Sequence, residues 1–304
     1  MTSYDKLGPD ELRLALELLL APPGASRAAA RALVPGFCDY LEAGNLRWEG
    51  WRYGPPAAPA ALFLAVFLPG RTALVFIPEP GLRGIDPAAQ LRLTRAAIDE
   101  LSTRDLHYAQ ALLENAAGAR HELLSHVGFR TLAPLLYMDR SVVFPWVDAP
   151  AAPQLDWLGF DEQTYPEFAD TILASYQDSQ DCPELTGLRP IADVIASHRA
   201  TGHFDPTLWD LARLENQSAG CLLLARHTYA AIIELVYMGV VPAWRRRGVG
   251  TLLLRRAVQQ CRARGARRLT VVVDERNAPA HCLYERFAFA TVARREAYWL
   301  RFAR

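Results

Sequence analysis

A basic loop with two glycines opens a helix in the second half of the chain. An apolar strand ending at Val241 runs through Pro242 into the segment RRRGVG, residues 245–250, and then into an amphipathic helix. The first amides of a helix have no intrahelical acceptor, and the helix dipole adds about half a positive charge. Glycines let an anion approach these amides, and arginines add charge-assisted hydrogen bonds. The pattern predicts a polyphosphate site, although the loop alone is also compatible with a solvated helix start.

The strand before this loop contains one carboxylate. Residues 231–241 read AIIELVYMGVV, and Glu234 is the ionisable carboxylate among them. A carboxylate in an apolar strand is costly unless it is paired or used in chemistry. Glu234 is therefore either a functional acid or base, or the partner of an arginine on a neighbouring strand. Gly239 in the same strand predicts a bulge or a close approach to the backbone.

These residues lie within a regular succession of predicted elements. In the first half, hydrophobic periodicity predicts helices near 9–20, 26–42, 87–103 and 116–127, and strands near 45–53, 61–68, 72–78, 106–112 and 130–140. In the second half it predicts helices near 163–176, 189–199, 249–264 and 278–287, and strands near 154–160, 207–214, 219–226, 230–241, 267–274 and 290–302. The two halves have the same order of elements.

This shared order indicates a degenerate tandem repeat. The segment EPGLRGID after Pro78 resembles AWRRRGVG after Pro242, although two strand-to-helix turns can also be alike by chance. The proline- and alanine-rich stretch VVFPWVDAPAAP separates the halves. We therefore expect one domain at 1–141, a linker at 142–153 and a second domain at 154–304.

Composition narrows the class of protein. The 304 residues suit two domains, and the 33 Lys+Arg and 33 Asp+Glu provide no overall charge to attract nucleic acid or an anionic membrane. The N-terminal segment predicts an amphipathic helix, not a signal peptide. The five cysteines form no CxxC pair, and the histidines show no metal-ligand spacing. We expect a soluble cytoplasmic protein without a bound metal, and the sequence gives no indication of its oligomeric state.

A second motif lies downstream of the loop. The segment DERNAPAHCLYERFAF, residues 274–289, resembles the N-x-x-A-x-x-L-Y-x-x-x-G-F pattern of the GNAT acetyltransferase superfamily, and Arg245 to Gly250 resembles its R-x-x-G-x-G signature. Ala288 replaces the glycine of the pattern, where a positive φ would strain an alanine. The resemblance covers roughly residues 154–304. It implies an α/β fold of two tandem GNAT domains, each a mixed, mostly antiparallel twisted sheet flanked by helices, an arrangement similar to that of mycothiol synthase.

The resemblance also implies a function. The expected activity is direct transfer of an acetyl group from acetyl-CoA to the primary amine of a small molecule or peptide. By resemblance, Glu234 is the general base, and Tyr284, near the thioester sulfur, is the general acid. The residues that the resemblance assigns to the cofactor are Met238, Val240, Arg245, Arg246, Arg247, Gly248, Val249, Gly250, Thr251 and Asn277. Asn277 is equally well explained as a helix N-cap, and Tyr284 as a core aromatic residue packing near Phe287.

The acceptor is expected near the segment between the first two helices of the second domain. This segment, residues 176–190, contains Asp178, Asp181 and Glu184, which either hold a cationic amine or form a solvated acidic loop. Cys282 is interpreted as a buried thiol without a part in acyl transfer.

The first half lacks several of these residues. When the repeats are aligned, Gly81 replaces Arg245, Asp86 replaces Gly250, and Leu124 occupies the position of Tyr284. A carboxylate opposes pyrophosphate binding, so we expect this half to be a scaffold or one wall of the acceptor cleft. Two other functions remain open. An acyl-CoA sensor would need neither Glu234 nor Tyr284, and an aminoacyl transferase would be expected to have a basic groove and no cofactor loop.

Overall fold

The computed structural model describes residues 4–21, 26–114, 117–143, 154–227 and 231–302. The chain forms two compact units, Met1–Leu132 with Arg295–Arg304, and Ala133–Arg294. Each unit contains a mixed, mostly antiparallel sheet flanked by helices, as the resemblance predicted. Apart from residues 142 and 143, the predicted linker lies outside the described residues.

The first unit is built on a sheet with one parallel pair, β4 with β5, among antiparallel neighbours. Its strands lie in the order β1 (Asp5–Lys6), β2 (Arg47–Tyr53), β3 (Ala61–Leu68), β4 (Thr72–Phe76), β5 (Tyr108–Leu113) and the end of β12 (Ala290–Arg301). Its helices are α1 (Leu12–Leu19), α2 (Arg27–Ala43), α3 (Pro87–Ser102) and α4 (Ala119–His126), and a 3-10 turn, η1, covers Pro9–Glu11.

Alternate residues of β3 are buried on the two faces of this sheet, which is covered by helices on both sides. Leu62, Leu64 and Val66 belong to the cluster formed with α1 and α2, whereas Phe63 and Ala65 belong to the cluster formed with α3 and α4. A strand with two buried faces is apolar throughout, as this one is.

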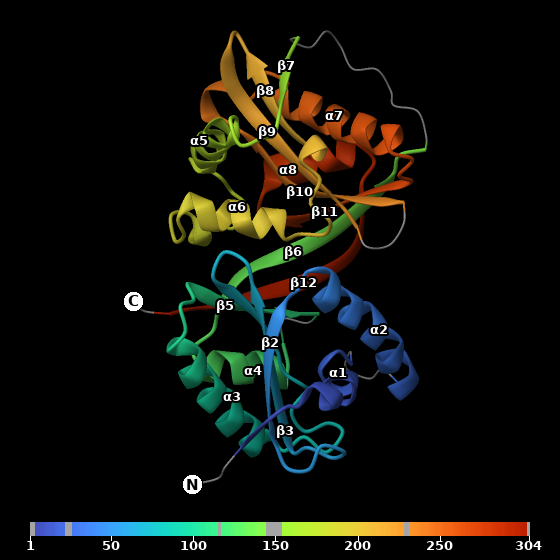
Figure 1. The fold of residues 1–304 in the computed structure, drawn as a ribbon, viewed down its shortest axis with the longest axis vertical. Helices are drawn as coiled ribbons and strands as arrows, with labels where there is room; N and C mark the ends of the chain where they lie inside the picture. Colours follow the sequence, from blue (N-terminus) through green and yellow to red (C-terminus); the bar gives the residue numbers. More distant parts are fainter. Residues whose placement is uncertain (1–3, 22–25, 115–116, 144–153, 228–230, 303–304) are drawn as a thin grey trace. The chain divides into compact units, whose positions relative to one another are not determined.

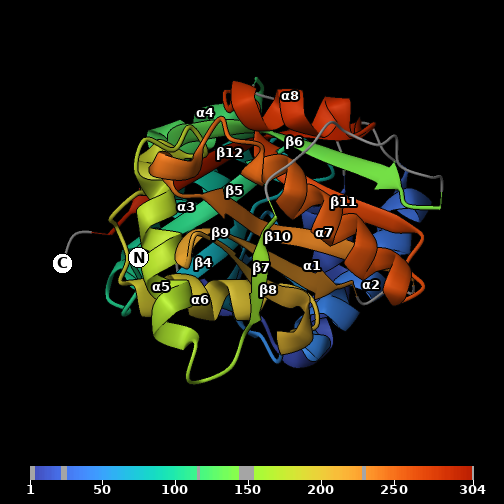
Figure 2. The ribbon, with the colours of Figure 1, turned by 90° about the horizontal axis from the view of Figure 1, so that it is seen from above.

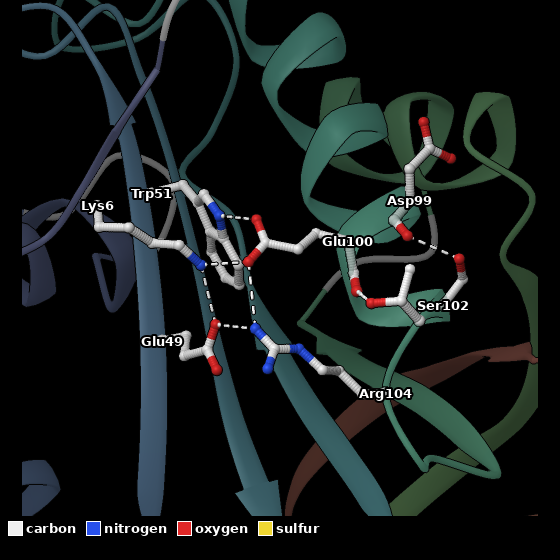
Figure 3. A network of polar contacts seen from close by, with 8 residues as sticks. Lys6, Glu49, Trp51, Asp99, Glu100, Ser102 and Arg104 are labelled. Atoms are coloured by element: carbon white, nitrogen blue, oxygen red, sulfur yellow. Dashed lines mark hydrogen bonds and ion pairs between the residues drawn. The ribbon is translucent and has the colours of Figure 1, made fainter.

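A network of charges fastens β1 to the end of α3 (Figure 3). The Lys6 ammonium lies 2.9 Å from a Glu49 oxygen and 2.6 Å from a Glu100 oxygen. The second Glu100 oxygen accepts from the Trp51 indole at 2.8 Å, and Arg104 donates to both carboxylates. The very short strand β1 is thereby held by side chains as well as by its backbone pairing.

The second unit contains the predicted site residues. Its sheet has the order β6 (Arg130–Ser141), β11 (Arg268–Asp274), β10 (Ile232–Val240), β9 (Gln217–Arg226), β8 (Trp209–Leu214) and β7 (Asp156–Gly159). Its helices are α5 (Tyr165–Tyr176), α6 (Ile191–Arg199), α7 (Val249–Ala263) and α8 (Ala278–Arg286), and its 3-10 turns are η2 (Pro183–Leu185), η3 (Pro206–Leu208) and η4 (Pro242–Trp244). Only β10 and β11 pair in parallel among its described strands.

Helices α5 and α7 cover opposite faces of β9 and β10 (Figure 1, Figure 2). A Cβ on Gly239 would meet the side chain of Ser175 on α5, whereas one on Gly220 would come within 3.2 Å of Leu253 on α7. Gly220 is paired with Val240, the residue after Gly239, so the two glycines face opposite sides of the sheet. The pairing register of β10 with β9 thus shows whether each β10 side chain lies on the α5 side or the α7 side of the sheet.

The compact units and the sequence halves differ at their ends. Strand β6, the last strand of the first sequence half, pairs with β11 of the second unit. Residues 296–301 of β12 pair instead with β5 of the first unit. The end of each sequence half therefore completes the sheet of the other unit. Within the described residues, none of the helices has the length and apolar character required to cross a bilayer.

Candidate functional site

The loop before α7 presents a row of backbone donors. The amides of Trp244 and Arg245 bond to Val241 and Pro242, and the next bonded amide is that of Leu252, which donates to Gly248. The amides of residues 246–251 have no acceptor within the described part of the chain. Gly248, with φ of 85°, is the N-cap of α7 and has no side chain to accept from them. The loop is thus a set of unused donors at a helix N-terminus, which favours an anion.

The side chain of Arg245 is directed to carbonyl groups. Its Nη2 donates to the carbonyls of Ser175 and Gln177 at 3.0 and 2.7 Å, and its Nε donates to that of Val240 at 3.0 Å. A longer contact of 3.4 Å joins Nη1 to the carbonyl of Asp178. By contrast, Arg246 and Arg247 are exposed, and the Arg247 guanidinium lies 5.0 Å from the centre of the Trp244 ring.

In the equivalent loop of the first unit, several backbone donors are already bonded within the chain. The Asp86 carboxylate accepts from the Ala89 amide at 2.6 Å and so caps α3. The amides of Gly81, Ile85 and Asp86 all bond to backbone carbonyls. Asp86 and Pro87 thus begin α3 without a ligand.

Strands β10 and β11 separate beside the loop. Within the described residues their paired register runs from Ile232 to Leu235, and β10 has an irregular register between Leu235 and Tyr237. The Val241 amide donates to Ala219 on the β9 side, and backbone groups alternate along a strand. Those of Met238 and Val240 therefore point to the side where β11 no longer pairs. This open edge lies where backbone contacts to a ligand were expected.

Glu234 faces the α5 side of the sheet. Its partner on β9 is Ala225, and those of Tyr237 and Gly239 are Leu223 and Cys221, so these three β10 residues share one face because of the irregularity. Burial raises the pKa of Glu234 above its ordinary value. Among the described residues no arginine pairs with Glu234, and the predicted alternative of an ion pair is not observed.

Sequence reasoning missed a group of side chains on the same face. The Tyr237 hydroxyl lies 2.7 Å from Ser175 Oγ, and the Tyr237 ring stacks on His198 of α6 at 5.3 Å. Burial, with the nearby Arg189, lowers the pKa of His198 to about 4, so the ring is neutral near pH 7. Gly239 is explained by the same group, because a Cβ there would lie 2.4 Å from Ser175 Oγ. The Y-x-G spacing in β10 is the sequence signal for this packing.

Tyr284 is buried on α8, with its ring 5.3 Å from that of Phe289. Burial, and secondarily Asp181, raises the pKa of its hydroxyl well above the ordinary value. The hydroxyl has no hydrogen-bond partner in the described chain. Asn277 caps α8 by accepting from the Ala280 amide at 3.3 Å, and its side chain also hydrogen-bonds to Asp181.

Ala288 stands where the GNAT motif has a glycine, and its φ is 55°. The alanine therefore has the strained left-handed conformation that the sequence predicted for this position.

The segment 176–190, which we call the acceptor segment, is tied to the end of β11. The fully buried Asp274 carboxylate accepts from the Cys182 amide at 3.0 Å and from Arg276, and the Arg276 guanidinium binds both oxygens of Glu184 at 2.8 and 3.0 Å. Burial would raise the pKa of Asp274, but these hydrogen bonds outweigh it and lower the pKa. Glu184 is therefore committed to an ion pair.

Asp181 and Asp178 remain as the other predicted acceptor residues. Asp181 keeps solvent contact as a residue, but its carboxyl group is enclosed by neighbours and accepts from the Asp274 amide at 3.1 Å. This enclosure is the largest effect on its carboxyl and raises its pKa. Asp178 is exposed, with φ of 54°.

Two further features bear on cofactor and metal chemistry. Cys282 is exposed, so the expectation of a buried thiol is wrong; position 282 lies on the outer side of α8, opposite the buried Tyr284. Within the described residues no group of three or more His, Cys, Asp or Glu side chains is arranged to hold a metal ion.

Comparison with known proteins identifies the family. A sequence profile described as "Acetyltransferase (GNAT) family" matches residues 172–289. Mycothiol acetyltransferase of Clavibacter michiganensis is 30% identical over 228 residues, which cover 69% of this chain and 68% of that protein. The chain belongs to the acetyltransferase (GNAT) family. The corresponding protein of Beutenbergia cavernae is 38% identical over 93 residues, but the match spans only 31% of its length and 30% of this chain.

Solved GNAT structures show the same fold over the whole chain. The GCN5-related N-acetyltransferase from Sphaerobacter thermophilus superposes with a TM-score of 0.65 at 17% identity, covering 99% of this chain and 96% of that one. A tandem GNAT protein from the clavulanic acid biosynthesis pathway gives a TM-score of 0.54 at 13% identity, covering 99% of both chains. The tandem GNAT arrangement predicted from sequence is thus confirmed.

Proposed function

We propose that the second unit transfers an acetyl group from acetyl-CoA directly to a primary amine of a small molecule or peptide. The observation that carries this proposal is the row of unbonded amides at residues 246–251, placed beside the open edge of β10. Membership of the GNAT family supports an acyltransferase. The donor, the amine and direct transfer are our proposals.

The donor would bind along the loop and the open edge. The amides of residues 246–251 would hold the pyrophosphate, and the exposed Arg246 and Arg247 would add charge. Met238 and Val240 would pair with the pantetheine arm through their outward backbone groups. In the first unit Asp86 already occupies the equivalent helix start, so we expect one donor site per chain.

Glu234 is proposed as the general base. An alkylamine has a pKa of about 10.4, so near pH 7 only about one molecule in a thousand is uncharged. An ordinary glutamate, at about 4.3, would accept its proton uphill by about 6 units, or roughly 8 kcal/mol. Burial raises the pKa of Glu234 and narrows this gap. The absence of an ion-pair partner among the described residues leaves its carboxylate available for the proton.

Tyr284 is proposed to donate a hydrogen bond to the leaving sulfur. A thiol with pKa of about 8.5 and a phenol of about 10 differ by roughly 2 kcal/mol, so full proton transfer to the thiolate is uphill. Burial raises the pKa of Tyr284 and keeps it protonated. Stabilisation of the departing thiolate by its O–H group is therefore the larger part of its role.

The acceptor amine is proposed to approach from the acceptor segment. Because Arg276 neutralises Glu184, Asp181 and Asp178 are the carboxylates left to attract an ammonium group. Asp181 is the stronger candidate, since its charge contributes to the raised pKa of both Tyr237 and Tyr284 and so acts at the proposed site.

The decisive experiment is an amine screen with acetyl-CoA. Release of the CoA thiol would be followed with a panel of primary amines that includes the unacetylated form of mycothiol, because of the name of the relatives. An enzyme releases thiol only when its amine is present and yields the acetylated amine by mass spectrometry. A sensor binds acetyl-CoA in calorimetry but shows no amine-dependent release with any member of the panel, and that outcome would refute the proposed function.

A further inference from the structure

Arg245 connects the phosphate loop with the end of α5, a segment about 70 residues earlier in the chain. Its guanidinium binds the carbonyls of Ser175, Gln177 and Asp178, and its Nε binds that of Val240. The last carbonyls of a helix lack intrahelical donors and carry the negative end of its dipole, so a cation is favoured there. The planar guanidinium fork presents donors on three separate nitrogens and so reaches carbonyls on both sides, whereas the three donors of a lysine ammonium are all on one compact nitrogen.

An anion would stabilise the observed conformation of the phosphate loop. Arg246 has a φ of 62°, in the left-handed region, and the amides of residues 246–251 have no acceptor in the described chain. The left-handed φ costs free energy, and hydrogen bonds from these amides to an anion would offset that cost. An anion that binds them stabilises this conformation, and thereby the position from which Arg245 reaches α5.

The acceptor segment is held independently at its middle. The Cys182 amide and the Glu184 carboxylate bind Asp274 and Arg276 at the end of β11. Among the described residues, those from 177 to 180 make no comparable contact with β11 before Asp181, and Asp178 has a left-handed φ of 54°. The contacts of Arg245 are therefore the main link between this turn and the cofactor side of the unit.

We infer that Arg245 is a positioning residue that couples occupation of the phosphate loop to order in the acceptor segment. The inference rests on the proposed function. Acyl-CoA would bind first, fix the loop and Arg245, and so hold Asp178 and Asp181 in place for the amine. Coupling between two sites is reciprocal, and values of about 5- to 150-fold are typical. The first unit has glycine, Gly81, at the equivalent position and so lacks this link.

Hydrogen exchange with coenzyme A alone tests the coupling without knowledge of the amine. The reporter amides are those of Gln177 and Ser179, which bond to carbonyls at the end of α5 at 3.3 and 3.1 Å, together with that of Asp181. In the wild-type protein, saturating CoA is expected to slow their exchange about tenfold.

Arg245→Lys preserves charge but loses the fork. This variant should bind CoA within about threefold of wild type, while the slowing at residues 177–181 disappears. Arg245→Gln serves as a second variant with the same expectation. The matched control is Arg247→Gln, on the same loop but stacked on Trp244; it should weaken CoA binding and, at saturation, retain the slowing. With an amine from the screen, Arg245→Lys should raise KM for the amine and leave KM for acetyl-CoA near the wild-type value.

Four results would overturn the inference. If both Arg245 variants lose CoA affinity by more than about tenfold, Arg245 is a direct ligand of the pyrophosphate. If Arg245→Lys keeps the full slowing, the link does not pass through its fork. If wild-type protein binds CoA without slowing, the coupling is absent although the proposed function stands. Failure of wild-type protein to bind CoA at all would remove the proposed function and this inference together.

Discussion

Replacing Glu234 with glutamine gives a sharp test of the proposed base, because the side chain keeps its shape while it loses its basicity. Positioned general bases contribute about 10²- to 10⁴-fold. For an amine with pKa of about 10.4, free amine near pH 7 is about one part in a thousand, so the loss should lie within this range. The variant should recover about tenfold per pH unit as the pH approaches the pKa of the amine.

The acidic limb of the wild-type profile follows from the same carboxyl group. Activity requires the deprotonated base, and burial raises the pKa of Glu234. The limb should therefore lie above about pH 4.3, the ordinary value for glutamate, and should be absent from the glutamine variant. The assay is the pH dependence of kcat/KM, measured on both proteins with the same amine.

The effect of Glu234→Gln on the melting temperature should be opposite to the effect of breaking an ion pair. A carboxyl group whose pKa is raised on folding stabilises the protein below its unfolded pKa, and this stabilisation is lost as the pH rises through the folded pKa. At neutral pH the charged Glu234 therefore destabilises the folded protein, and Glu234→Gln should melt at a higher temperature than wild type. The difference should shrink as the pH falls toward about 4.3.

Two outcomes would refute the reasoning. A lower melting temperature for Glu234→Gln at neutral pH would mean that the carboxylate has a stabilising partner. A pH–rate profile of unchanged shape would remove Glu234 from the mechanism.

Three more variants address the rest of the unit. Tyr284→Phe should keep its melting temperature, because the hydroxyl has no partner in the described chain, and should lower kcat about ten- to a hundredfold without changing acetyl-CoA affinity; unchanged kcat would make Tyr284 a packing residue. Gly250→Asp should weaken acetyl-CoA binding in calorimetry at least about a hundredfold, and the neutral Gly250→Asn much less, since a Cβ there meets only an ordinary contact at 3.4 Å; equal losses would indicate a steric effect. Ala288→Gly should raise the melting temperature by about 1–2 °C, because relief of the left-handed strain exceeds the entropy that glycine adds to the unfolded chain; no gain would show that the strain is relaxed.

The sequence predicted local structure well because its signals are local. Apolar periodicity located each of the major helices and strands to within about three residues. The basic loop with two glycines, residues 245–250, located a helix whose first amides are unbonded, and the structure shows the N-cap that was one of the two interpretations of Asn277. All of these depend on residues that are close in the chain.

The partners of the charged side chains could not be predicted in this way. Arg245 was assigned to an anion by its motif, but the carbonyls that it binds belong to residues about 70 positions earlier. Glu184 was considered for the amine, yet its partner Arg276 is 92 residues away. A charge pattern gives the sign of a preferred partner, and the folded chain decides which of several suitable groups comes close enough.

The exchange of strands between the two units has a consequence for how the protein is made. Residues 296–301 complete the sheet of the first unit at β5, yet they are translated after the whole of the second unit. During synthesis, the edge of β5 that pairs with β12 therefore stays unpaired while more than half of the chain is translated, and unpaired strand edges favour aggregation. The first unit reaches its final form only after the second has been synthesised, although most of its residues are translated first.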